Sequence, residues 1–317
     1  MPVTVDPAPD PDPDPAPAPA TRPVVVRRRW SVANVAVAVV VFAGIATLTY
    51  PTAADWFSDL AHASEISGYV HDVAGTDAAS LRDLREAAQV YNAHLPNGPL
   101  RDPYVLNASG EGESVAAGRS TYEALLSPTP GAPMARIRIP SIDVDLPIYH
   151  GTDDATLAKG IGHLYGSGLP VGGPSTHAVL TGHSGLPNAT LFTHLDEVRK
   201  GDLFFIDVAG EELAYRVDQI EVVKPDDGED LRQVPGHDYV TLLTCTPTGV
   251  NTHRLLVRGE RVARSAASES ANVAPPPAPG PPWWAAAVVG GAGVGCVIAW
   301  PRRRASAAEG VPTARDL

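Results

Sequence analysis

Three residues whose side chains could carry out acyl transfer stand at the ends of short apolar runs. Cys245 closes the run 239–245, and Arg254 opens the next one. The segment 246–251 between them contains Pro and Gly, which predicts an antiparallel strand pair with Cys245 and Arg254 close together at one end. His183 also follows a strand-like run. A thiol, an imidazole and a guanidinium are the parts of a cysteine acyl-transfer site.

Each of these residues also has an ordinary interpretation. Cys245 could be a small buried residue, His183 a loop histidine and Arg254 a surface strand arginine. A neutral thiol attacks amides poorly, so Cys245 needs a base, and His253 is an alternative to His183 in that role. A metal site is a further alternative, although no tight ligand spacing supports it; it would use His177, His183 and His194.

Three separated segments resemble the active-site stretches of sortases, most closely the class C, pilin-polymerising sortases. They are residues 181–187, 241–249 and 251–260. The resemblance implies a sortase-type closed β-barrel in which Cys245 is the nucleophile and His183 the acid and base. In this reading, Arg254 stabilises the oxyanion. It implies no cofactor and no metal.

An upstream tripeptide, Asp102-Pro103-Tyr104, resembles the lid that plugs the active site of class C sortases. The carboxylate of Asp102 would face Arg254, and the ring of Tyr104 would cover the thiol. The family more often has Phe or Trp where this chain has Tyr. The alternative is an ordinary Asp-Pro turn.

The resemblance implies cleavage of an LPxTG-type sorting signal between Thr and Gly through a thioester. A pilin lysine would then accept the acyl group, so the expected partners are pilin subunits or surface proteins with C-terminal sorting signals. One alternative is a housekeeping sortase that attaches proteins to the cell-wall precursor. A non-enzyme alternative is an inactive, membrane-tethered binding scaffold.

Two apolar stretches without charges predict membrane-spanning helices. They cover residues 30–50 and 283–300, and each has aromatic residues at both ends. Arg27 to Arg29 precede the first stretch, and Arg302 to Arg304 follow the second. This pattern predicts a protein that crosses the cell membrane twice, with both termini in the cytoplasm and the catalytic domain outside the cell. The first stretch could instead be a cleaved signal peptide, and the second an apolar tail.

Composition supports one folded core with appendages. The formal net charge of -12 argues against a nucleic-acid partner. Cys296 lies in the second apolar stretch, so we expect no disulfide with Cys245, and a lone exported thiol favours chemistry.

The remaining pattern divides the chain between these stretches. About eight short strands predict a mainly β, eight-stranded closed barrel, and residues 189–198 are expected to form a helix within it. The predicted segments are a disordered tail (1–29), an extracellular helical region (51–99), a lid loop (100–131), the barrel domain (132–265), a Pro-rich spacer (266–282) and a cytoplasmic tail (301–317).

Overall fold

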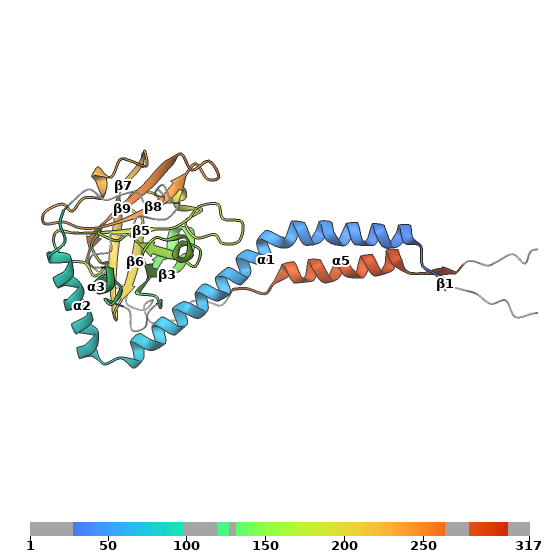
Figure 1. Cartoon of the computed structure of the whole chain (residues 1–317), viewed down its shortest axis with the longest axis horizontal. Coiled ribbons are helices and arrows are strands. Elements are labelled where there is room, and N and C mark those ends of the chain that lie inside the picture. The colour runs from blue at the N-terminus through green and yellow to red at the C-terminus, as the bar shows by residue number, and fades with distance from the viewer. Residues whose placement is uncertain (1–27, 98–118, 127–130, 264–278, 304–317) are drawn as a thin grey trace, which may run out of the picture. The chain divides into compact units, whose positions relative to one another are not determined.

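The computed structural model describes residues 28–97, 119–126, 131–263 and 279–303. Eight strands close into a barrel in the order β2-β3-β4-β5-β8-β9-β7-β6 (Figure 1). The strands are β2 (Ala135–Ile139), β3 (Val144–His150), β4 (Ile161–His163), β5 (Thr176–Thr181), β6 (Leu203–Val208), β7 (Glu211–Val223), β8 (Asp238–Thr246) and β9 (His253–Val262). β3 pairs with β4, and β5 with β8, in parallel; the other barrel pairs are antiparallel. The predicted eight-stranded closed barrel is confirmed.

Two strands differ from the sequence pattern. The pattern indicates separate strands at 213–217 and 220–223, but β7 is one strand with an irregular register between Val217 and Gln219. β4 was not predicted, because it is short and contains Gly162. The number of strands was therefore right, although the division of the chain was not.

Side chains from all eight strands fill the barrel. The rings of Phe204 and Tyr215 stack there, with centroids 5.4 Å apart. Gly259 lies against Phe204, where a Cβ atom would collide with the ring. This close packing is typical of protein interiors, where even one added methyl group is felt.

A second apolar cluster packs separately from this interior. Its members come from β5, β8, β9 and the loops around them: Leu164, Val179, Leu231, Leu243 and Leu256, with Val223 packed against it. Because neighbouring residues in a strand face opposite sides of the sheet, Leu243 and Leu256 lie on the outer face of the barrel when Leu242 and Leu255 lie inside.

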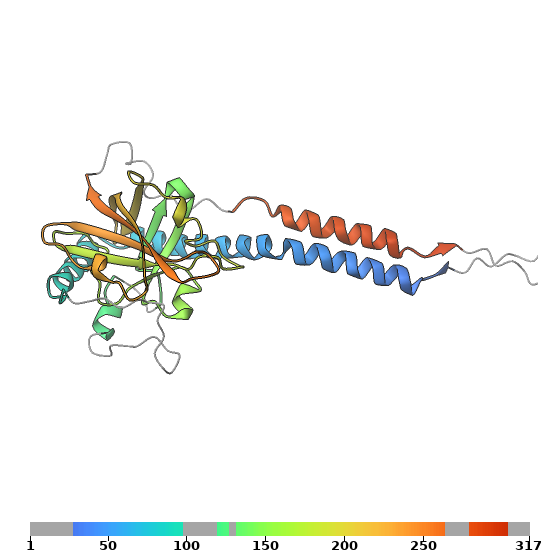
Figure 2. The ribbon, with the colours of Figure 1, turned by 90° about the horizontal axis from the view of Figure 1, so that it is seen from above.

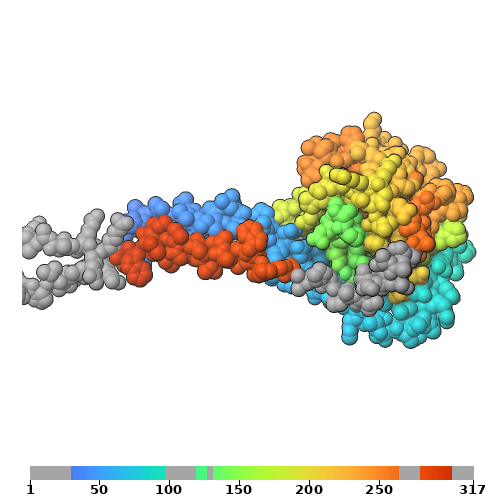
Figure 3. Space-filling model, turned by 180° about the vertical axis from the view of Figure 1, so that it is seen from behind, coloured from blue at the N-terminus to red at the C-terminus, as the bar shows by residue number. Residues whose placement is uncertain are grey.

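A helix of the N-terminal region covers part of the barrel. α2 (Ala78–Ala93) begins at Asp77, whose carboxylate accepts hydrogen bonds from the backbone N–H groups of Ala79 and Ser80. Leu81, Leu84 and Tyr91 of α2 pack against the barrel interior cluster, in which Ala88 is fully buried. Figure 3 shows α2, in cyan, lying directly on the barrel.

One long helix, α1 (Val32–Gly75), covers both the predicted first span and the start of the helical region. It continues through Pro51, where we expected a new segment to begin. Within the described residues, α1 is the helix long and apolar enough to cross a membrane, judged by length and composition. The second apolar stretch forms a shorter helix, α5 (Trp283–Ala299).

The chain divides into two compact units, residues 1–45 with 288–317 and residues 46–287. In the first unit, α5 lies beside the start of α1, with Gly291 next to Ile45 and Gly295 next to Ala38 (Figures 1 and 2). Two short strands also pair there, β1 (Arg28–Arg29) and β10 (Arg302–Arg303).

Several short elements complete the fold. A helix, α3 (Arg119–Glu123), lies inside the stretch that we expected to be a loop, and its Tyr122 is buried. The others are η1 (Pro140–Ile142), α4 (Asp154–Leu157), η2 (Leu195–Glu197) and η3 (Glu229–Leu231).

Candidate active site

Cys245 and Arg254 face each other across the last strand pair. β8 and β9 are antiparallel, and Cys245 is the Cα partner of Arg254 in their register. Directly paired residues project from the same face of a sheet. Both are nearly buried, each with 7% exposure. The proximity predicted from the sequence is confirmed.

His183 lies on the other side of Cys245. It follows β5, which runs parallel to β8 with Thr181 paired to Leu243. The ladder continues beyond the strand, since the N–H of Gly182 donates to the carbonyl of Leu243 at 3.1 Å. His183 therefore reaches the level of Cys245.

Two hydroxyl groups fasten the end of β5 to β8 at this level. Thr244 Oγ1 donates to the carbonyl of Gly182 at 2.7 Å, and Ser184 Oγ donates to the carbonyl of Cys245 at 2.7 Å. The strand order β5-β8-β9 thus brings His183, Cys245 and Arg254 together, with the thiol in the middle. Ser184 and Thr244 were not predicted as site residues, although each adjoins a predicted one in the sequence.

The predicted helix at residues 189–198 is wrong. Apart from η2, this segment consists of turns, and Leu191 has a positive φ of 38°, which a right-handed helix does not allow. The segment instead folds back onto His183: the N–H of Phe192 donates to the carbonyl of His183 at 3.0 Å, and Thr193 Oγ1 accepts from the N–H of Gly185 at 2.9 Å.

Burial lowers the pKa of His183 below its ordinary value of 6.5, and the negative charge of Asp154 partly opposes this shift. Desolvation disfavours the charged imidazolium. At neutral pH the ring is therefore mainly uncharged and able to accept a proton. Asp154 of α4 was not recognised from the sequence, because only the fold relates it to His183.

Arg254 brings a permanent positive charge to the same face. Its Nη1 donates to the carbonyl groups of Asn251 and His253, both at 3.1 Å, which holds the guanidinium over the β8–β9 loop. A fixed cation beside a nucleophile can stabilise an oxygen that becomes negative during acyl transfer.

The alternatives to this set fit the structure less well. His253 is adjacent to Arg254 on β9 and pairs with Thr246, so strand alternation directs it to the opposite face. A metal site built on His177 is disfavoured, because both of its ring nitrogens already have hydrogen-bond partners. Its Nδ1 lies 2.8 Å from the carbonyl oxygen of Arg232, and its Nε2 lies 2.7 Å from Thr241 Oγ1. Over the described ranges, no cluster of three or more His, Cys, Asp or Glu could hold a metal ion.

The lid tripeptide Asp102-Pro103-Tyr104 lies outside the described residues. Neither cysteine forms a disulfide; Cys245 is buried and Cys296 exposed.

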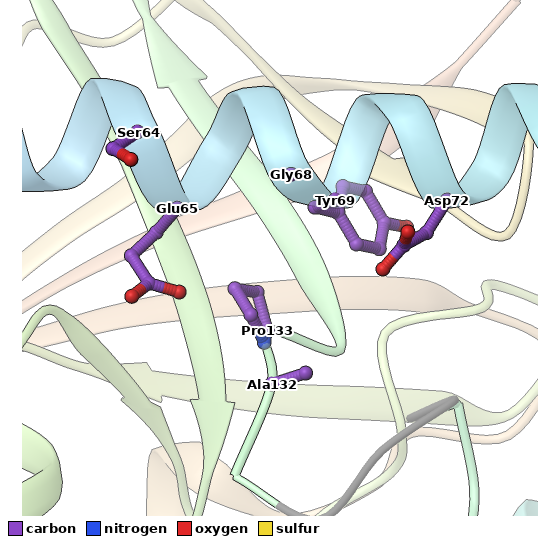
Figure 4. A pocket seen from close by; sticks show the side chains of 7 residues that line it. All are labelled: Ser64, Glu65, Gly68, Tyr69, Asp72, Ala132 and Pro133. Atoms are coloured by element: carbon purple, nitrogen blue, oxygen red, sulfur yellow. The ribbon is translucent and has the colours of Figure 1, made fainter.

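A cleft of about 160 Å³ lies between α1 and the segment before β2 (Figure 4). Glu65 and Asp72 give it an acidic rim, and Tyr69 and Pro133 form part of its wall. None of its lining residues belongs to the group around Cys245, so it is separate from the candidate active site.

Comparisons with known proteins agree with the fold and with the set of residues. The model of the sortase domain matches residues 137–262. Sortase D of Bacillus subtilis is 30% identical over 143 residues, which are 44% of this chain and 69% of that protein.

Two solved structures are similar over most of their lengths. Sortase C-1 from Actinomyces oris is 49% identical with a TM-score of 0.55, over 59% of this chain and 99% of that chain. Sortase C1 of Streptococcus agalactiae is 43% identical with a TM-score of 0.56, over 65% of this chain and 98% of that chain. The resemblance to class C is confirmed, and the chain belongs to the sortase family of cysteine transpeptidases.

Proposed function

We propose that this sortase cleaves an LPxTG-type sorting signal between Thr and Gly and transfers the acyl group to a lysine of a pilin subunit. The observation that carries the proposal is the register of β5, β8 and β9, with Cys245 paired to Arg254 and His183 at the same level. Similarity to two class C sortases supports the pilin lysine as the acceptor.

The first half of the reaction forms a thioester. His183 accepts the thiol proton as the sulfur of Cys245 attacks the Thr carbonyl carbon, and the carbonyl electron pair moves onto oxygen. Arg254 stabilises the resulting oxyanion. When the tetrahedral intermediate collapses, the Thr–Gly C–N bond breaks, and His183 gives its proton to the departing Gly amine.

The second half reverses these roles. The lysine amine attacks the thioester carbon and loses a proton to His183, and the C–S bond of Cys245 breaks. The thiolate then recovers the proton from His183. The products are an isopeptide bond and the original enzyme, so no cofactor is consumed.

The acceptor distinguishes this proposal from a housekeeping sortase. The purified full chain in detergent should be given a sorting-signal peptide together with either a pilin-derived lysine peptide or a soluble analogue of the cell-wall precursor. Isopeptide product with the lysine peptide supports polymerisation. Product with the precursor analogue alone would assign the protein to cell-wall anchoring instead.

We also propose that the enzyme is a two-pass membrane protein with its catalytic domain outside the cell. The apolar composition of α1 and α5 supports two spans, and the arginines that flank residues 30–50 and 283–300 support cytoplasmic termini. On this topology, residues 1–29 and 301–317 are cytoplasmic tails, and residues 266–282 are an extracellular spacer.

Aromatic side chains that follow the first apolar stretch and begin the second fit a membrane interface. Trp56 and Trp284 lie with ring centroids 6.1 Å apart, and Trp56 Nε1 donates to the carbonyl of Gly280 at 2.7 Å. Tryptophan prefers the interfacial region of bilayers. Protease digestion of intact cells should therefore degrade the barrel while both tails stay protected.

The lid belongs to the same proposal. If Asp102 and Tyr104 cover the thiol, replacing both by Ala should speed alkylation of Cys245 by a bulky reagent. An exposed ion pair and one aromatic contact each contribute about 1 kcal/mol, so the acceleration should be tens-fold at most. An unchanged alkylation rate in full-length protein would reduce the tripeptide to an ordinary turn.

A further inference from the structure

A hydrogen bond joins α1 to the turn beside His183. Thr190 Oγ1 donates to Asp55 Oδ1 at 2.8 Å, and both groups are partly buried. These residues are 135 positions apart in the chain and belong to the same compact unit. Asp55 lies in the part of α1 that follows Pro51, so the contact connects this part of α1 with the loop after β5.

Thr190 lies in the turn that holds the histidine in place. The N–H of Thr193 donates to the carbonyl of Thr190 at 2.8 Å, and the N–H of Phe192 donates to the carbonyl of His183 at 3.0 Å. Thr193 Oγ1 also accepts from the N–H of Gly185. The backbone at His183 and at Gly185, two residues after it, is thus bonded to this turn.

Packing reinforces the hydrogen bonds. Phe192 is fully buried and lies against Gly182, where a Cβ atom would come within 2.8 Å of the ring. There is no space for the ring to move toward β5. The position of the turn and the position of the His183 backbone are therefore coupled.

We propose that Asp55 is a positioning residue for His183, acting through Thr190 and the turn of residues 188–193. The inference rests on the proposed catalytic role of His183. A carboxylate acceptor gives a stronger hydrogen bond than a neutral one, so Asp55 is suited to fixing this turn relative to α1. An imidazole must lie within hydrogen-bond reach of the proton it moves, and a small misplacement slows the chemical step more than substrate binding.

The neighbouring residue Asp59 provides a matched control. It lies one turn further along α1, and burial together with the charges of Asp55 and Asp143 raises its pKa to about 6. Within the described part of the chain, the hydrogen bonds of the turn 188–193 involve Asp55 and not Asp59. Asp59→Asn should therefore leave turnover unchanged.

The test is a double-mutant cycle on the full chain in detergent, with kcat and KM measured on a sorting-signal peptide. Asp55→Ala and Thr190→Val should each lower kcat about tenfold and leave KM within about twofold, as expected for the loss of one charge-assisted hydrogen bond. The double variant should be no slower than either single variant, because both remove the same interaction. Thr190→Ser, which keeps the hydroxyl donor, should retain most of the rate, and Asp55→Asn, which keeps only a neutral acceptor, should fall between the wild type and Asp55→Ala.

A second readout follows the imidazole itself. In spectra of histidine-labelled protein, the resonances of His183, assigned by their loss in His183→Ala, should shift and broaden in Asp55→Ala but not in Asp59→Asn. Two results would overturn the positioning role, provided that His183→Ala is inactive. One is that the losses of kcat in Asp55→Ala and Thr190→Val add up in the double variant. The other is that Asp55→Ala leaves both kcat and the His183 resonances unchanged. Normal turnover in His183→Ala would instead remove the catalytic role of His183 on which this inference rests.

Discussion

The inward and outward faces of the three strands β5, β8 and β9 differ in the residues that they carry. The inward residues are apolar and almost fully buried in the barrel interior: Ala178, Leu180, Val240, Leu242, Leu255 and Val257. The outward residues at the end of the same strands include Cys245 and Arg254, with His183 just beyond β5. Between these polar groups and the middle of the sheet lie apolar outward residues, among them Leu243 and Leu256.

This difference follows from the two-residue period of a strand, and it separates stability from chemistry. A change on the inner face should act mainly on the free energy of unfolding, whereas a change at the outer end should act mainly on turnover. Burial also affects the outer end of these strands, because it lowers the pKa of His183, and a less polar environment strengthens electrostatic effects such as the one proposed for Arg254.

The largest effect should come from the outward thiol. Cys245→Ala should abolish transpeptidation, because no other group in the proposed site can form the thioester. Cys296→Ala should retain full activity, since this residue lies in α5. Steady-state assays of the two variants with a fluorescent sorting-signal peptide check the prediction, and residual turnover in Cys245→Ala would contradict it.

The two residues beside the thiol should cause the next largest losses. Removing an acid–base group or an oxyanion-stabilising group typically costs ~10² to 10⁴ in rate, so His183→Ala and Arg254→Ala should both be slowed by factors in this range. Arg254→Lys should recover little, because a point charge does not replace a planar guanidinium. Single-turnover rates measure these effects.

His253 tests whether the face of the strand matters. It is adjacent to Arg254 but directed away from Cys245, so His253→Ala should keep near-normal rates. Loss of activity in His253→Ala combined with normal activity in His183→Ala would transfer the base role to His253 and break the distinction between the faces.

An inward residue should show the opposite behaviour. Leu242 is fully buried, and Leu242→Ala should lower the free energy of unfolding by about 2 to 5 kcal/mol through lost contacts and a new cavity. The molecules that remain folded should keep kcat within about twofold. Chemical denaturation followed by near-ultraviolet circular dichroism of the barrel tyrosines, together with active-site titration, separates the two quantities; a large fall in kcat per folded molecule would show that the faces are not independent.

The smallest effect concerns pH. Because the pKa of His183 is lowered below 6.5, its ring stays neutral at pH 7, and kcat/KM should fall only as the pH drops below about 6.5. Asp154 raises the pKa of His183, so Asp154→Asn should lower that pKa further and move the acid limb to lower pH. An acid limb above 6.5, or a shift to higher pH in Asp154→Asn, would contradict the assignment.

The regular parts of the fold were predictable where the pattern was regular. Most strands alternate or form apolar runs, and the stripe containing Leu81, Leu84 and Tyr91 correctly indicated α2. Residues 189–198 resemble a helix in sequence because Leu191, Leu195 and Val198 have helical spacing, but the segment is determined by its bonds to His183 and to α1. Such long-range contacts leave no local pattern.

Some residues of the candidate site could likewise be predicted from the sequence, and others could not. Cys245 and Arg254 could be placed together because they flank one hairpin loop, and His183 because its segment resembles those of sortases. Asp154, Ser184 and Asp55 could not be found, since their relation to the site depends on how β5 and α1 lie in the folded protein.

Mapping the acyl adduct tests the central claim most directly. The full chain in detergent should be mixed with an excess of sorting-signal peptide at low acceptor concentration, quenched in acid, digested and analysed by mass spectrometry. We predict a thioester that carries the peptide up to its Thr on Cys245, with Cys296 unmodified. An adduct elsewhere, or cleavage of the peptide with an adduct that persists in Cys245→Ala, would contradict the account.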